Sequence, residues 1–201
     1  MKWLFNMENP VMRALSAAAD LMLLNLLTLL CCLPVFTMGA ALTALNAAAI
    51  KLVRGEEETA VRDFFRGFRA NFKKGTILGL IFLLIFGMLA ADYLAAGSFA
   101  PVLRPVIAAI ALLVLMVGMY AFALPARYEN TIAGTLKNAV LLAVAYFPRT
   151  AGMVVFAMTF WILIVTFLAY GAPVFILCGL SLPCYVAVLL LQPVFTNLEK
   201  S

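Results

Sequence analysis

The sequence predicts an all-α integral membrane protein, with about six transmembrane helices and one or two amphipathic helices at the cytoplasmic surface. Of its 201 residues, 66% are hydrophobic and 11% are charged, whereas a soluble domain is about 45–50% apolar and about 25% charged. So few charges would leave a soluble protein with large exposed apolar patches. A single membrane domain over residues 1–201 is expected at this length.

Four apolar segments are long enough to cross a bilayer, which takes about 20 residues. They are 76–96, 102–124, 150–170 and 172–191. They form two predicted helix pairs, 76–125 and 150–192. A removable signal peptide is the competing interpretation for the first apolar run, but that run begins late and further spans follow it, so we expect a retained helix.

The apolar block 14–53 is too long for one span, because about 40 helical residues reach roughly 60 Å, twice the hydrocarbon thickness. Within it, the motif CLPVFTMG contains Pro34, Thr37 and Gly39. Proline breaks a helix, threonine caps the next one, and glycine relieves crowding at a turn. The prediction is a short hairpin of helices 14–33 and 37–53. The second helix is short, so a re-entrant hairpin is an alternative to a full crossing.

The basic residues predict the orientation. With both termini in the cytoplasm, every Lys and Arg except Arg104 lies on the cytoplasmic side, as the positive-inside rule requires. We therefore expect a multi-pass protein of the bacterial cytoplasmic (inner) membrane with short outer loops. Asp92 is expected to pair with Arg104 at the outer end of 76–125.

An interfacial amphipathic helix is predicted over 59–75. Its side chains alternate between an apolar arc and a basic arc of a helical wheel. The phenylalanines would enter the acyl boundary and the cations would meet anionic headgroups. The residues assigned to this membrane-surface helix are Arg62, Phe64, Phe65, Arg66, Phe68, Arg69, Phe72 and Lys73.

A second interfacial helix is predicted over 135–149, in the same position before its own helix pair. Aligning Thr76 with Thr150 also matches Phe72 with Tyr146. A duplicated unit of one interfacial helix and two spans, in parallel orientation, is one hypothesis. Within the first unit, Gly75 and the sequence GTILG form a pattern that permits close helix packing.

Polar residues occur in two places. Asp20 and Asn25 lie inside the first span, where they are expected to point inward because a charge facing lipid is costly. A second group is expected at the cytoplasmic face, either to dock a partner or to form a structural ion-pair cluster. Its members are Arg127, Glu129, Asn130, Lys137, Asn138 and Arg149.

Catalytic chemistry is not expected. The sequence has no GxxxxGK[ST], HExxH or GxSxG motif and no histidine. Its four cysteines lie in apolar segments without a CxxC pair, so we expect no metal site and no cofactor. The apolar face of the basic helix favours a membrane over nucleic acid. The chain is predicted not to be an enzyme.

Several polar islands resemble one family across nearly the whole chain. The stretches are NLLTLLCCLPVFTMG (25–39), KLVRGEE (51–57), RDFFR (62–66), NFK (71–73), ARYENT (126–131), TLKNA (135–139) and FPRT (147–150). They are similar to the YesL-like family of bacterial membrane proteins, a domain of unknown function. Members commonly lie beside genes for carbohydrate ABC importers and polysaccharide-degrading enzymes. The resemblance therefore implies an accessory role in sugar uptake.

Three hypotheses follow. The first is a non-enzymatic partner of carbohydrate ABC transporter subunits. The second is a small transporter or channel, acting as a homo-oligomer, with a pathway lined by polar residues of the hairpin. Those residues are Asp20, Asn25, Thr28, Thr43 and Asn46. The third is a membrane scaffold or folding factor without a small-molecule ligand.

Overall fold

The computed structural model describes residues 10–55, 59–99, 101–128, 130–166 and 175–198, which form helices joined by short turns and loops, with no strand among them. Six helices are long and apolar enough to cross a membrane, which confirms the predicted fold class. The elements are α1 (Pro10–Cys32), η2 (Val35–Thr37), α2 (Met38–Arg54), α3 (Ala60–Phe99), η3 (Pro101–Leu103), α4 (Arg104–Ala123), α5 (Ile132–Ala145), α6 (Phe147–Thr166) and α8 (Ser181–Leu198).

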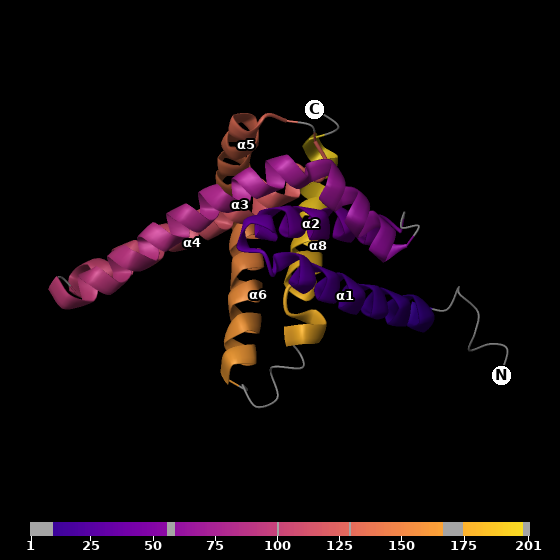
Figure 1. Cartoon of the computed structure of the whole chain (residues 1–201), viewed down its shortest axis with the longest axis horizontal. Coiled ribbons are helices and arrows are strands. Elements are labelled where there is room, and N and C mark those ends of the chain that lie inside the picture. The colour runs from indigo at the N-terminus through magenta and orange to yellow at the C-terminus, as the bar shows by residue number, and fades with distance from the viewer. Residues whose placement is uncertain (1–9, 56–58, 100, 129, 167–174, 199–201) are drawn as a thin grey trace.

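Helix α2 lies at the centre of the molecule (Figure 1). It contacts α1, α3, α4 and α8, and α3 and α4 extend away from it together as a long arm (Figure 1). The segment Val35–Arg54 is the most enclosed of the six candidate spans, with 61% of it buried in the protein. Its alanine-rich sequence explains this position, because small side chains allow several helices to approach its backbone.

The predicted hairpin break is present, but Thr37 acts differently from the prediction. Helix α1 ends at Cys32, and Pro34 has an extended backbone. The Thr37 hydroxyl lies 2.6 Å from the carbonyl of Cys31 and 2.8 Å from that of Pro34, so its one hydrogen is shared between the two oxygens. It makes no side-chain cap bond to α2. The predicted capping role is therefore wrong: the Thr37 side chain bonds back to the carbonyl of Cys31 in the last turn of α1.

Gly39 also has a different role from the expected relief of a turn. It lies in the first turn of α2 and meets α3. A Cβ atom on Gly39 would lie 2.1 Å from the carbonyl oxygen of Gly75 and 2.5 Å from Cα of Gly79. The GTILG pattern therefore closes a contact within the chain, where two backbones cross without intervening side chains.

Helix α3 joins two segments that the sequence predicts separately. It runs without interruption from Ala60 to Phe99, through both the interfacial segment 59–75 and the span 76–96. The second predicted pair of segments, 135–149 and 150–170, is separated in the structure, but earlier than expected. Helix α5 ends at Ala145 and α6 begins at Phe147, because Pro148 has no N–H to donate to the carbonyl four residues before it.

Candidate functional site

Asn25 is the most heavily bonded polar side chain of the predicted intramembrane group. It is fully buried in α1. Its amide nitrogen donates to the carbonyls of Phe175 and Ile176 at 2.9 and 2.8 Å, and its oxygen accepts from the backbone N–H groups of Leu180 and Ser181 at 2.7 and 3.0 Å. These groups lie before, within and after the two-residue turn at 179–180, which connects the helical segment 175–178 to α8. Both amide hydrogens are used, so Asn25 acts as a structural bridge.

The other polar residues of the hairpin bond to their own helices. The hydroxyl of Thr28 donates to the carbonyl of Leu24, and that of Thr43 to the carbonyl of Gly39; both side chains are buried. Asn46 donates to the carbonyl of Leu42. Asp20, predicted to point inward, is partly exposed. Of the residues proposed to line a pathway, Thr28, Thr43 and Asn46 are thus held by bonds to their own helices, and Asn25 links helices.

A buried ion pair, which sequence reasoning missed, joins the end of α2 to the start of α3. Lys51 Nζ contacts Asp63 Oδ1, and the Asp63 side chain is almost fully buried. The second carboxylate oxygen of Asp63 is buried without a hydrogen-bond partner among the described residues. One signal in the sequence could have predicted this ion pair: Asp63 is a single acidic residue within a strongly basic helix.

A second missed feature is a buried hydroxyl pair. The Tyr120 hydroxyl of α4 lies 2.9 Å from Oγ1 of Thr150 in α6. Thr150 Oγ1 also lies 3.0 Å from the carbonyl of Tyr146, to which it donates, and 3.4 Å from that of Ala143. Each hydroxyl has one hydrogen, so the consistent arrangement has Tyr120 donating to Thr150 and Thr150 donating to Tyr146. The pair fixes the break between α5 and α6.

The predicted polar cluster is distributed along the surface near α5. Arg127 lies over the ring of Tyr128, and Arg149 lies over that of Tyr146, each 5.8 Å from the ring centroid. Lys137 and Asn138 are exposed on α5. Glu129 lies outside the described residues, and Asn130 is partly buried in the loop before α5. No hydrogen bond or ion pair links Asn130, Lys137, Asn138 or Arg149 to another described member.

The amphipathic part of α3 has three faces, one buried, one apolar and exposed, and one basic and exposed, where the sequence predicted only an apolar and a basic face. Phe64 is fully buried and packs against α1 and α2 in a core cluster with Leu24 and Leu45. Its predicted place in the acyl boundary is therefore wrong, because α2 covers that side of α3. Phe65 and Phe72 remain exposed by 49% and 37%. The basic residues Arg62, Arg66, Arg69 and Lys73 are all exposed.

The predicted outer clasp between Asp92 and Arg104 is not formed. Both residues are described, and no ion pair joins them. The Arg104 guanidinium lies over the ring of Tyr93, 5.3 Å from its centroid, and a nitrogen of the guanidinium approaches Gly97 closely. A cation–π contact of this kind replaces the expected salt bridge at this end of the α3–α4 arm.

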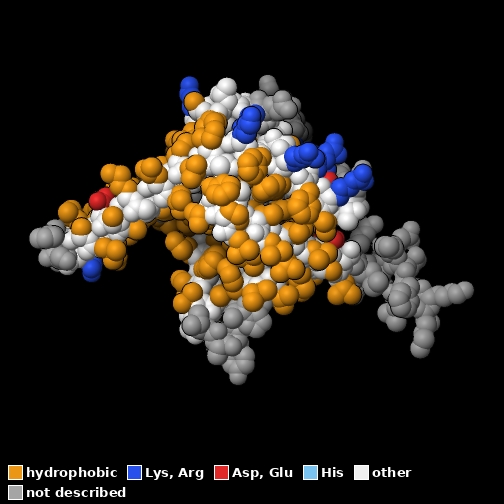
Figure 2. Space-filling view, in the orientation of Figure 1, with side chains coloured by type: hydrophobic (Ala, Val, Ile, Leu, Met, Phe, Trp, Pro, Cys, Tyr) orange, Lys and Arg blue, Asp and Glu red, His pale blue; other side chains and the backbone are white. Residues whose placement is uncertain are grey.

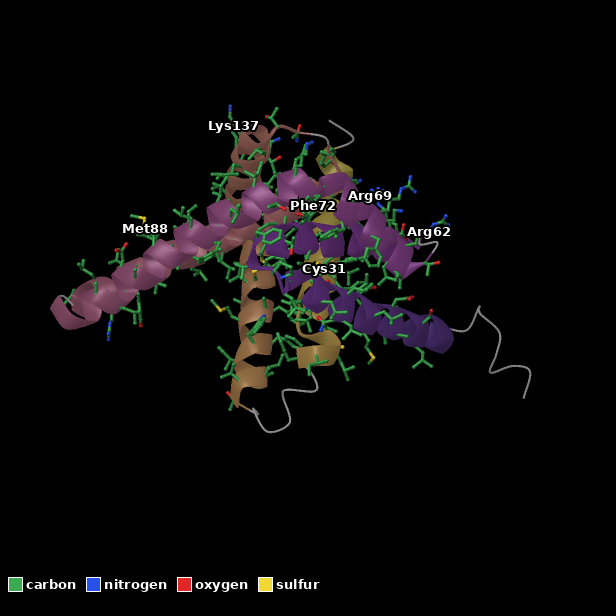
Figure 3. All side chains as sticks on the ribbon, in the orientation of Figure 1. Cys31, Arg62, Arg69, Phe72, Met88 and Lys137 are labelled. Carbon is green, nitrogen blue, oxygen red and sulfur yellow. The ribbon has the colours of Figure 1, made fainter. Side chains whose placement is uncertain are left out.

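The basic residues gather on one face. We define the basic face by Arg62, Arg66, Arg69, Lys73 and Lys137. Figure 2 shows Lys and Arg side chains along the upper edge of the molecule above a broad hydrophobic body, with a single basic side chain at the far end of the arm. In Figure 3, the labelled Arg62, Arg69 and Lys137 lie along this same edge and point away from the ribbon.

These features define the class: a multi-pass helical membrane protein with an internally bonded core and one strongly basic face. A family model described as "Protein of unknown function, DUF624" matches residues 21–93, the region from within α1 to near the end of α3. Neither the curated proteins nor the solved structures contain a match.

Proposed function

We propose that this chain is a non-enzymatic, YesL-like protein of the bacterial cytoplasmic membrane that serves as an accessory subunit for carbohydrate uptake by an ABC-type importer. One observation carries the choice of an accessory role over a transport pathway. The buried polar side chains of Asn25, Thr28 and Thr43 form their hydrogen bonds with backbone groups. The cations of the basic face, in contrast, point outward. The outward surface is therefore the one equipped to meet a partner.

The match to the family model supports the direction of the proposal. The matched residues 21–93 include the CLPVFTMG, KLVRGEE and RDFFR stretches on which the YesL-like resemblance rests. The link to carbohydrate import comes from the gene neighbourhood typical of that family.

The orientation belongs to the same proposal. The basic face lies on the cytoplasmic side, and both termini lie there too, because positive residues are retained on that side during insertion. Arg104 lies alone at the opposite end of the arm. Single cysteines in a cysteine-free chain at Lys137 and at Val102 test this. The membrane-impermeant thiol reagent should label position 102, but not 137, in cells with a permeabilised outer envelope. The reverse pattern would contradict the orientation.

Co-purification tests the accessory role. A tagged chain produced at its native level and extracted in mild detergent should retain the permease or ATPase subunit of a carbohydrate importer. Lys137→Glu with Asn138→Glu should reduce this recovery, since both side chains are exposed on α5 and reversed charge opposes docking. The control variant Leu163→Met, on the exposed side of α6, leaves the charges of the basic face unchanged. It should retain the partner. Recovery of the chain without any importer subunit would refute the proposal.

A further inference from the structure

The amphipathic part of α3 contains a hollow of about 510 Å³ that sits among cations and phenylalanines. We call it the α3 hollow. It is lined by Phe68, Arg69, Ala70, Phe72, Lys73 and Lys74. We infer that the α3 hollow binds the phosphate headgroup of an anionic phospholipid, with the acyl chains extending along the adjoining surface of α3. This inference does not depend on the importer partner.

The cations of the α3 hollow are available to a ligand. Arg69 and Lys73 are exposed and Lys74 is partly exposed. In the described part of the chain, none of the three forms a hydrogen bond or an ion pair. The neighbouring acid on this helix segment, Asp63, is already paired with Lys51. A phosphate diester would supply the missing negative charge and accept hydrogen bonds from both side-chain types.

The floor of the α3 hollow is fixed by a row of aromatic rings. Phe64 is fully buried in the core, and its ring stacks on Phe68 with centroids 6.2 Å apart. Phe68 in turn meets Phe72 edge to face at 5.4 Å. Figure 3 shows Phe72 on α3 beside the central helices, with Arg69 further along the same helix. The row anchors the site to the core, so the cations stand beside a rigid apolar surface.

The position of the α3 hollow selects a lipid over a soluble anion. Lys74 is the last charged residue before an apolar run, Gly75 to Ala91. Arg69 and Lys73 lie on the same helix face as Ile77, Leu80 and Leu84, since these positions follow at spacings of three or four. Those three aliphatic side chains are exposed by 43%, 45% and 70%. One face of α3 thus changes from cationic to aliphatic at the hollow, matching a headgroup and its acyl chains.

Native mass spectrometry of the full chain in mild detergent tests this. Equal amounts of phosphatidylglycerol and phosphatidylcholine are offered, and bound lipid is measured over a concentration series. The wild type should retain phosphatidylglycerol in preference. Arg69→Gln with Lys73→Gln should weaken that binding roughly thirtyfold, and Lys73→Gln alone about fivefold, because each cation near such a surface contributes about 1 kcal/mol.

The matched control removes two other cations of the basic face, with Arg62→Gln and Lys137→Gln, and should bind phosphatidylglycerol like the wild type. Thermal unfolding without added lipid confirms that each variant is folded, and the single variant keeps the test valid if the double variant is not. Equal weakening in the control, equal retention of phosphatidylcholine, or displacement by millimolar glycerol phosphate would each overturn the inference; the last would indicate a site for a soluble anion.

Discussion

Two segments of the chain, a first unit of residues 60–123 and a second unit of residues 132–166 and 175–198, connect their helices differently. In the first, α3 runs unbroken from the basic segment into the span, and α4 returns beside it. In the second, α5 and α6 are separated at Tyr146, and α8 contacts α6. Under the alignment that matches Thr76 with Thr150, Lys74 corresponds to Pro148. Lys74 has a backbone N–H, so α3 continues through it as one helix. Pro148 lacks this N–H, so α5 and α6 are separate helices.

The two units are also held in different ways. Gly75 and Gly79 let α3 meet α2 at Gly39 through backbone atoms. The break in the second unit is held by Thr150, which bonds to the carbonyl of Tyr146 and to the Tyr120 hydroxyl of the first unit. The continuous helix is therefore held by close backbone packing, whereas the interrupted one is tied to α4 by a side-chain hydrogen bond beside the break.

The largest expected effect comes from filling the glycine contact of the first unit. Gly39→Ala should lower the free energy of unfolding by about 3 kcal/mol, because its Cβ would clash with backbone atoms that cannot rotate away. Thermal unfolding in detergent measures it. The control is Gly87→Ala on α3, where a Cβ would meet nothing within 4 Å; it should be neutral or stabilising. Equal destabilisation by both changes would show that helix flexibility, and not the crossing, explains the glycines.

The next effect concerns the connection of α1 to the start of α8. Asn25→Leu should cost about 2–3 kcal/mol of unfolding free energy, because it removes four hydrogen bonds to backbone groups, each worth about 0.6 kcal/mol on average within a membrane. Asn46→Leu, which loses one bond inside its own helix, should cost under about 1 kcal/mol. If Asn46→Leu were the more damaging change, the assignment of Asn25 as the structural bridge would fail.

A smaller effect is expected at the hydroxyl pair of the second unit. Tyr120→Phe should cost about 1 kcal/mol of unfolding free energy, because it removes one buried hydrogen bond while keeping the ring in the core. A double-mutant cycle with Thr150→Ala measures the coupling between the two side chains. Strictly additive losses would show that the two hydroxyls do not interact in the folded protein.

The smallest energetic effect should come from converting the second unit to resemble the first. Pro148→Ala restores an N–H, so α5 and α6 should join into one helix at a change of under about 1 kcal/mol. Spin labels at Lys137 and Val155 in a cysteine-free chain should then lie about 27 Å apart. Labels at Arg62 and Leu80, equally spaced on the continuous α3, provide the reference. An unchanged distance after substitution would assign the break to Thr150 and its surroundings.

The sequence predicted the spans and the position of the hairpin break well, because apolar runs and proline act locally. It did not predict the roles of Thr37 and Gly39, since both depend on which neighbour the folded chain brings near. The Lys51–Asp63 pair and the Tyr120–Thr150 pair were missed for the same reason: each joins different helices, and nothing local shows which helices meet. For Phe64, the periodicity identified an apolar face but not whether lipid or α2 would cover it.

In-cell photocrosslinking from the basic face tests the proposed role most directly. A photoreactive residue at Lys137 or Asn138, both exposed on α5, is activated in growing cells, and adducts are identified by mass spectrometry. Leu163, exposed on α6, is the matched control position. The prediction is an adduct with a permease or ATPase subunit of a carbohydrate importer from α5 and none from position 163. Adducts only between copies of this chain would contradict the accessory role and favour a homo-oligomeric transporter.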